Sequence, residues 1–229
     1  MRLASVLFAL CALLARGATK VPETIRQINA AAAVFDEVNA DPDSGIPRDI
    51  LDKARCIAIV ASLKHADFIL GAKYGKGVVA CRDKDISSGW AGPSFFRIEN
   101  GSVGFQFGAG ETDLVLVLMN QSAMNKLLDD KFELNAESGV AAGPVGRSAP
   151  APNAEILSYS RAHGNFDGVA LTGITLRPAD ELNAVYYGHD AAAREILTGA
   201  IAPPHTAGVL TSTLDKYIPS AKKSRGSRR

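Results

Sequence analysis

The histidines are the residues in this chain that would suit acid–base catalysis or metal binding. There are four: His65, His163, His189 and His205. None has the i, i+4 spacing of the HExxH zinc motif, and no GxSxG nucleophile elbow occurs. His189 and Asp190 form a potential orienting pair, but the sequence places no serine or cysteine nucleophile opposite them. The histidines therefore indicate no defined catalytic site.

Two carboxylates, Glu111 and Asp113, stand one residue apart in a run that reads as a strand. Alternate strand residues point the same way, so these two could share an acid–base site. The commoner alternative is a charged rim residue followed by an aspartate at the strand entry. The segment around Gly75 and Gly77 departs from the dinucleotide-binding fingerprint, because it joins two strands instead of opening a helix. We therefore expect a non-enzymatic protein with no cofactor and no metal site.

The elements that position these residues are mainly strands. Between residues 68 and 120, short apolar runs alternate with glycine-bearing turns, the pattern of antiparallel strands joined by tight connections. We expect a chain reversal at residues 74–77 and further strands at 93–97, 102–107 and 114–119. The last of these is apolar on both faces, which predicts a central, doubly covered strand. The expected fold class is α+β, with an antiparallel β-sandwich or barrel-like core and flanking helices.

One helix precedes these strands, over residues 22–39. Ile25, Ile28, Phe35 and Val38 recur at helical spacing and make one narrow apolar stripe. A membrane-seeking amphipathic helix is one interpretation. The opposite face is not basic, so the sequence favours a helix docked on the sheet.

The charged residues are unevenly distributed along the 229 residues. All 24 acidic residues lie between Glu23 and Asp215, whereas six of the 25 basic residues lie between Lys216 and Arg229. The body of the chain is therefore acidic, and we expect no nucleic-acid partner. The basic C-terminal tail is expected to meet something anionic.

The chain begins with a predicted targeting segment, residues 1–17. It combines a basic start, an apolar run too short to span a bilayer and small residues at the cleavage site. We expect a secretory signal peptide, one domain over residues 18–202 and a basic, disordered tail over residues 203–229. Cys56 and Cys81 would remain after cleavage. They form either a disulfide, which an oxidising compartment permits, or two ordinary buried thiols.

The order of short motifs along the chain is similar to that of a known family. The motifs are IP (46–47), CIAIV (56–60), GAKYGKGVV (71–79), GWAGP (89–93), GSVGFQFG (101–108), TDLVLV (112–117), VAAGPVGR (140–147), SYS (158–160) and YYG (186–188). This set resembles the SYLF domain family, also called the actin-binding domain family of yeast endocytic proteins. The resemblance covers roughly residues 21–198.

The resemblance implies a non-enzymatic module that binds anionic phospholipid, phosphoinositides in eukaryotic relatives, and in some members actin filaments. With the predicted signal peptide, it implies a bacterial secreted-type member. We therefore expect a peripheral membrane protein, secreted or in the periplasm or cell envelope. The alternative is a structural or protein-interaction module, actin-binding-like, with a protein partner and no lipid ligand.

The residues expected to contact lipid are basic and lie near the predicted hairpin. They are Lys64, Lys73, Lys76, Arg82 and Lys84, with tail contacts from Lys222, Lys223 and Arg225. Each basic residue at an anionic surface contributes about 1 kcal/mol, so a few would give weak, salt-sensitive attachment. The alternative is that these side chains solvate strand edges and deter edge-to-edge pairing.

Overall fold

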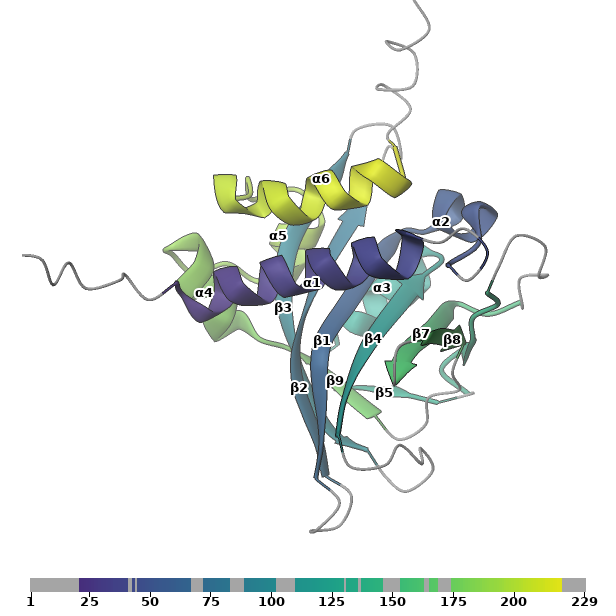
Figure 1. Ribbon diagram of the computed structural model, residues 1–229. Helices are drawn as coiled ribbons and strands as arrows, with labels where there is room; N and C mark the ends of the chain where they lie inside the picture. Colours follow the sequence, from purple (N-terminus) through teal and green to yellow (C-terminus); the bar gives the residue numbers. More distant parts are fainter. Residues whose placement is uncertain are drawn as a thin grey trace, which may run out of the picture.

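The computed structural model describes residues 21–40, 43, 45–66, 72–82, 89–101, 110–129, 131–135, 137–145, 153–162, 165–168 and 174–219, with the backbone alone at some strand ends. In these ranges, helices pack on one large β-sheet (Figure 1). The helices are α1 (Glu23–Ala40), α2 (Arg48–Lys53), α3 (Gln121–Leu127), α4 (Asp180–Tyr187), α5 (Ala193–Leu197), the 3-10 helix η1 (His205–Ala207) and α6 (Gly208–Tyr217). The strands are β1 (Cys56–Ala66), β2 (Ala72–Arg82), β3 (Trp90–Gly101), β4 (Gly110–Leu118), β5 (Phe132–Leu134), β6 (Val140–Ala142), β7 (Ile156–Ala162), β8 (Asn165–Gly168) and β9 (Ile174–Pro178).

The strands follow the order β5-β9-β3-β2-β1-β4-β7-β6, with β8 paired to β7. All the described pairings are antiparallel except that of β6 with β7. The strands at the two ends of this order, β5 and β6, are close in sequence. Between them Val140 N donates a hydrogen bond to Asn135 O over 3.3 Å. The sheet thus curls until its edges approach, which confirms the expected α+β fold with a barrel-like core.

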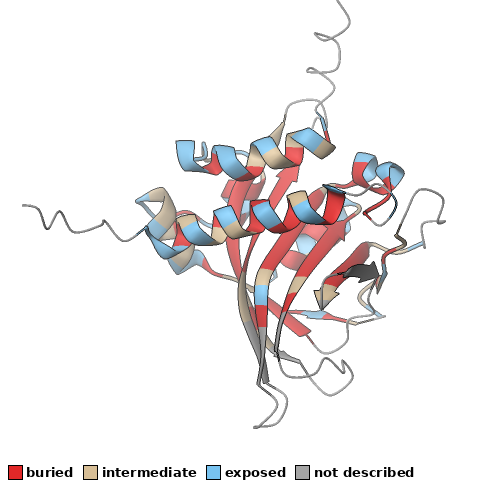
Figure 2. Cartoon of the chain, viewed as in Figure 1, coloured by how far each residue is buried: buried red, intermediate tan, exposed pale blue. Residues whose placement is uncertain are grey.

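The central strands are buried on both faces, because their side chains alternate between two cores. On β4, Leu114 and Leu116 belong to the interior of the curled sheet, whereas Val115 and Val117 belong to the core under the helices. Figure 2 shows the buried residues of the central strands and of the helix faces turned toward them. The predicted doubly covered strand at residues 114–119 is confirmed, since β4 lies between β1 and β7. The strand expected at residues 102–107 lies outside the described residues.

Helix α1 crosses the outer face of the sheet, as its apolar stripe predicted. Ile28, Phe35 and Val38 are buried against that face. The carbonyl of Pro22 accepts a hydrogen bond from Arg26 N, so proline occupies a position where its missing N–H costs nothing. Across the described part of the chain, no helix has both the length and the apolar character that a bilayer span needs.

Part of the segment expected to be a disordered tail is helical, which corrects that prediction. η1 and α6 fold residues 205–217 against α1. The phenol of Tyr217 donates to Asp36 Oδ1 over 2.8 Å, and its ring meets Phe35 edge-on. Proline-rich residues before η1 hid this helix, because they interrupt the periodicity on which the prediction depended. The predicted signal peptide and Lys222, Lys223 and Arg225 lie outside the described residues.

The predicted chain reversal at residues 74–77 is wrong. β2 continues through them and pairs with β3, with Lys76 opposite Arg97 and Gly77 opposite Phe96. The connection between β1 and β2 falls at residues 67–71, outside the described residues. Gly77 allows close packing instead, since a Cβ there would lie 2.3 Å from Cζ of Phe96. A tight chain reversal and the close approach of another side chain to the backbone both favour glycine. The glycines at positions 75 and 77 could therefore indicate either one.

Cys56 and Cys81 are directly opposite in the β1–β2 pairing and are joined by a disulfide. Their Cα atoms lie 4.0 Å apart, and both side chains are fully buried. Of the two alternatives left open by the sequence, the fold contains the disulfide.

Candidate functional site

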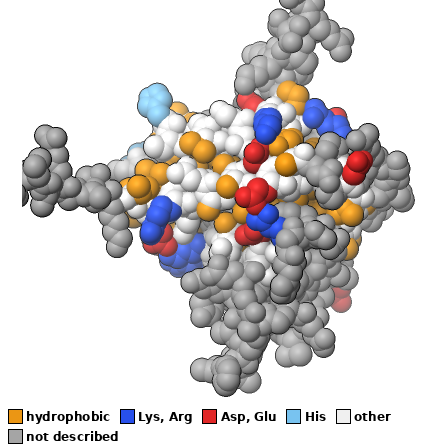
Figure 3. All heavy atoms as spheres, viewed as in Figure 1, with side chains coloured by type: hydrophobic (Ala, Val, Ile, Leu, Met, Phe, Trp, Pro, Cys, Tyr) orange, Lys and Arg blue, Asp and Glu red, His pale blue; other side chains and the backbone are white. Residues whose placement is uncertain are grey.

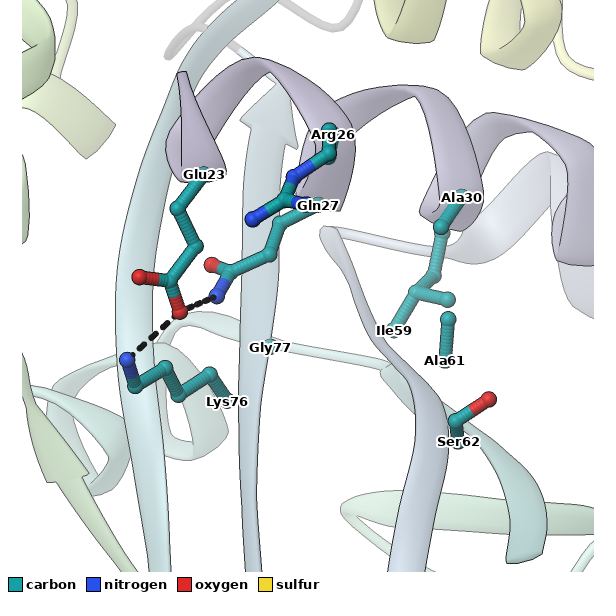
Figure 4. A pocket seen from close by; sticks show the side chains of 9 residues that line it. All are labelled: Glu23, Arg26, Gln27, Ala30, Ile59, Ala61, Ser62, Lys76 and Gly77. Atoms are coloured by element: carbon teal, nitrogen blue, oxygen red, sulfur yellow. Dashed lines mark hydrogen bonds and ion pairs between the residues drawn. The ribbon is translucent and has the colours of Figure 1, made fainter. Parts of the chain in front are cut away.

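A groove of about 460 Å³ lies between α1 and the outer face of β1 and β2. We call it the α1–β2 groove, and its lining is shown in Figure 4: Glu23, Arg26, Gln27, Ala30, Ile59, Ala61, Ser62, Lys76 and Gly77. Small residues on the helix and on both strands leave this space unfilled. Its floor is apolar, and its polar groups lie toward the beginning of α1 and at Ser62.

An ion pair closes one end of the groove. Lys76 Nζ on β2 lies 2.7 Å from Glu23 Oε1, which also accepts a hydrogen bond from Gln27 Nε2 over 3.2 Å. The hydrogen bond from Lys76 holds the pKa of the Glu23 carboxyl below its ordinary value. Both partners are largely open to solvent, with exposed side-chain fractions of 38% and 51%. Exposed pairs of this kind contribute little to stability, so the contact can be exchanged at low cost.

Ser62 lines the groove because β1 bulges there. The pairing of β1 shifts between Ile59 and Lys64 on one side and between Val60 and Leu63 on the other. Ser62 has φ +60°, and its N–H donates to Asp113 Oδ1 over 3.0 Å. A bulge re-aims the side chains around it, and a positive φ is unusual for serine.

Asp113 also belongs to the second ion-pair cluster along α1. Arg161 Nη2 on β7 lies 2.6 Å from Asp113 Oδ2, and Arg161 Nη1 contacts Glu37 on α1. Both hydrogen bonds to carboxylates raise the pKa of the Arg161 guanidinium against the opposing effect of burial. The cluster explains Asp113 as a structural residue that holds the bulge and the helix in place.

Arg26 differs from most described cations. The majority lie in ion pairs: Arg48, Lys76, Arg97, Lys126, Arg161, Arg177 and Lys216. Figure 3 shows the result on the α1–α6 face, where basic and acidic side chains lie side by side with apolar ones between them. Arg26 is exposed and forms no ion pair with a described residue. Its charge contributes, after that of Lys76, to the lowered pKa of Glu23, so two cations in the groove face one carboxylate.

A family model described as "Ysc84: Las17-binding protein actin regulator" matches residues 99–217, from the end of β3 through α6. The chain belongs to the Ysc84 family. This is the family that the motif order resembled, and the match extends to the end of α6, beyond the domain boundary expected from the sequence.

Relatives in yeast and in mammals match most of this chain. "LAS seventeen-binding protein 3" of Saccharomyces cerevisiae is 32% identical over 194 residues, which are 81% of this chain and 42% of the relative. "Protein YSC84" of the same organism is 30% identical over 181 residues, 76% and 38%. "SH3 domain-containing YSC84-like protein 1" of Homo sapiens is 32% identical over 191 residues, 80% and 55%. The chain thus spans about half or less of the length of these curated relatives.

The structure does not bring the predicted lipid-binding residues of this Ysc84-family chain together at one turn. Lys76 lies mid-strand, paired with Glu23. Arg82 is at the end of β2 as expected, but it is 4% exposed. It donates to Asp52 O over 3.0 Å and lies over the Trp90 ring. Desolvation on burial lowers the pKa of its guanidinium, and this side chain does not face solvent.

Two of the predicted lysines lie on adjacent strands near the connection of β1 to β2. His65 is opposite Lys73 and Lys64 opposite Tyr74, so the one-residue offset between Lys64 and Lys73 assigns them to opposite faces of the sheet. Lys84 lies outside the described residues. The predicted lysines therefore form neither a pair flanking a turn nor a cross-strand pair on one face of the sheet.

The residues considered for catalysis do not converge. His189 is exposed, and its Nδ1 lies 2.8 Å from Asp190 O. Asp113 is occupied by Arg161 and Ser62, and only the backbone of Glu111 is described. In the described part of the chain, no group of three or more His, Cys, Asp or Glu residues is placed to hold a metal ion.

Sequence reasoning missed the groove residues Glu23, Arg26 and Ser62. Glu23 and Arg26 carried a signal, since they occur three residues apart beside the apolar stripe of α1. Ser62 carried none, because a bulge inside an apolar run has no characteristic spacing.

Proposed function

We propose that this chain is a non-enzymatic protein-interaction module whose α1–β2 groove receives a protein partner of the actin machinery. The observation that carries the proposal is the groove itself, a concave surface with an apolar floor and an exposed arginine, Arg26, at its margin. The family description and the names of the yeast relatives, which refer to Las17 binding and actin regulation, support it. The relatives are longer than this chain, so their activity reaches it only as part of this proposal.

The groove suits binding better than chemistry. Its two groups that could serve as acid and base, Glu23 and Lys76, form an exposed ion pair with each other. The Arg26 guanidinium has hydrogen-bond donors and no acceptor, so it can serve only as a binding cation. An apolar floor with a few polar groups at its margin is typical of recognition surfaces, where arginine is enriched.

A second candidate ligand is anionic phospholipid, which the motif resemblance also implied. The observation that favours it is the register of β1 and β2, which places Lys64 and Lys73 near the 67–71 connection, one on each face of the sheet. Two lysines contribute about 1 kcal/mol each at an anionic surface. Arg82 is buried and adds nothing to such a contact, so this attachment would be weak and salt-sensitive.

The compartment separates the two candidates. We propose that the segment predicted as a signal peptide, residues 1–17, directs the protein out of the cytoplasm, to be secreted or held in the cell envelope; the buried Cys56–Cys81 disulfide, which an oxidising compartment permits, supports this proposal. An exported chain would meet envelope proteins and lipids in preference to cytoplasmic actin. Sequencing the N-terminus of the natural protein and titrating its free thiols distinguishes export from retention.

Co-sedimentation tests the proposal directly. The purified chain is centrifuged with actin filaments, with phosphatidylcholine vesicles and with vesicles containing phosphatidylserine. Pelleting with filaments that falls when Arg26 is replaced by Gln is the expected result. Pelleting with anionic but not neutral vesicles would support the lipid candidate instead, and no pelleting with any of them would contradict both.

A further inference from the structure

Three polar groups of the α1–β2 groove remain available to a ligand: Arg26 and Lys76 near the beginning of α1, and Ser62 on β1, apart from the two cations (Figure 4). Arg26 has no ion-pair partner in the described part of the chain. The Lys76 ammonium uses one donor on Glu23 and has others left. Ser62 holds Asp113 through its N–H and not through its hydroxyl. The two cations beside an apolar floor are complementary to a carboxylate next to an apolar side chain, and the Ser62 hydroxyl can hydrogen-bond another part of an extended ligand.

Ser62 supplies an independent observation. Its φ of +60° is a conformation that glycine adopts without steric cost and serine does not. If the bulge required only this backbone conformation, glycine would suit the position better. Strained residues of this kind concentrate at binding sites, and here the serine hydroxyl lies on the wall of the groove.

The Glu23 carboxylate already lies where a ligand carboxylate would contact Lys76. In Figure 4 its carboxylate points from α1 toward the Lys76 ammonium, across the mouth of the groove. The pair is exposed and therefore weak, so an incoming carboxylate can displace Glu23 at little cost. The position also lies at the first turn of the 18-residue helix α1, whose positive dipole end favours a negative group.

We infer that the α1–β2 groove binds an acidic segment of a partner protein in extended conformation, with a partner carboxylate replacing Glu23 on Lys76 and Arg26. Apolar side chains of the segment, alternating with its acidic ones, lie on the floor formed by Ala30, Ile59 and Ala61. This inference rests on the proposed function and specifies the chemistry of the partner. A concave groove walled by a helix fits a peptide better than the flat surface of a bilayer.

Fluorescence anisotropy with a defined probe tests the inference. The probe is a short fluorescein-labelled peptide in which aspartate and leucine alternate, and its counterpart carries lysine in place of aspartate. The wild-type chain should bind the acidic peptide only, less tightly as salt is raised. Arg26→Gln should weaken binding roughly tenfold, the loss of one charge-assisted contact. Ser62→Gly should weaken it while the chain stays folded.

Glu23→Gln gives the diagnostic result, because it should strengthen peptide binding about threefold by removing the internal competitor. A purely structural role for the Glu23–Lys76 pair predicts unchanged or weaker binding, which would overturn the inference. Glu181→Gln is the matched control, since Glu181 pairs with Arg97 at similar exposure away from the groove. Arg194→Gln is the matched control for Arg26→Gln, since Arg194 is an exposed arginine that lines a different pocket.

The failure of this inference is distinguishable from the failure of the proposed function. If the chain pellets with actin filaments but does not bind the acidic peptide, the interaction module stands and the acidic-segment inference is wrong. If Arg26→Gln reduces binding to phosphatidylserine vesicles and the peptide does not bind, the groove is a lipid site and the inference is again wrong.

Discussion

Lys76 Nζ lies 2.7 Å from Glu23 Oε1, and this contact joins the middle of β2 to the first turn of α1. Arg161 on β7 contacts Glu37 near the other end of the same helix. The two glutamates are fourteen positions apart, which corresponds to about 21 Å of helix. These two ion pairs therefore fix both ends of α1 on the sheet, and the groove lies between α1 and strands β1 and β2.

Glycine 77 should be the most sensitive small residue near the groove. Gly77→Ala would place a Cβ 2.3 Å from Cζ of Phe96 and 2.7 Å from the carbonyl oxygen of Ile59. We expect a loss of about 2–3 kcal/mol in the free energy of unfolding, measured in urea. Gly208→Ala is the control, because its Cβ would meet nothing within 4 Å and φ is −55°. It should raise stability by about 0.5–1 kcal/mol. Equal effects of the two substitutions would contradict this packing.

Tyr159 carries a buried hydroxyl with no hydrogen-bond partner in the described part of the chain. Its ring lies against Gly143, where a Cβ would be 2.1 Å from Cζ, and burial raises the pKa of the phenol. Tyr159→Phe keeps the ring and removes the unsatisfied group, so unfolding free energy should stay equal or rise by about 1 kcal/mol. Tyr217→Phe loses a hydrogen bond to Asp36 and should cost about 1 kcal/mol. A large loss in the Tyr159 variant would show that its hydroxyl has a partner.

The disulfide between Cys56 and Cys81 should stabilise the fold substantially. The two residues are 25 positions apart, and closing a loop of that length in the unfolded chain corresponds to about 3–4 kcal/mol. Urea unfolding of the oxidised and the reduced protein measures the difference. The Cys56→Ala/Cys81→Ala variant should behave like the reduced protein and be insensitive to reductant. Identical transitions before and after reduction would contradict the assignment.

The docking of α6 on α1 should depend on pH at both extremes. The hydrogen bond to Asp36 raises the pKa of Lys216 from 10.5 to about 12, so its stabilisation is complete below pH 10.5 and lost as pH rises through 12. The hydrogen bond from Lys216 lowers the pKa of Asp36 below 3.8, so that contribution is lost only as pH falls below this value. Hydrogen exchange of α6 across pH measures the effect. Lys216→Gln should abolish the part of the pH dependence that comes from the Lys216–Asp36 pair. If the pH profile of exchange in α6 is the same in the variant as in the wild type, the pair is not the origin of that dependence.

Most of the scaffold was accessible from residue pattern alone. The stripe of α1 and the apolar run of β4 were readable because each is periodic over several residues and buried as that period requires. The family followed from the order of glycine-rich motifs. The hairpin was misplaced because Gly77 is needed for contact with Phe96, which comes from another strand.

The groove was not accessible in this way, for a physical reason. Glu23 and Lys76 are far apart in the chain and meet only when α1 lies across β2. Ser62 enters the groove through a bulge defined by its pairing with two neighbouring strands. Helix α6 was also missed, since its position depends on Phe35 and Asp36 of α1.

Hydrogen exchange of the chain with and without actin filaments tests the central claim most directly, because it locates the contact surface. The account predicts slower exchange in residues 23–30 and 59–62, the segments that line the α1–β2 groove, and loss of this protection in Arg26→Gln. Protection confined to α4 and α5, or filament binding with unchanged exchange along the groove, would contradict it.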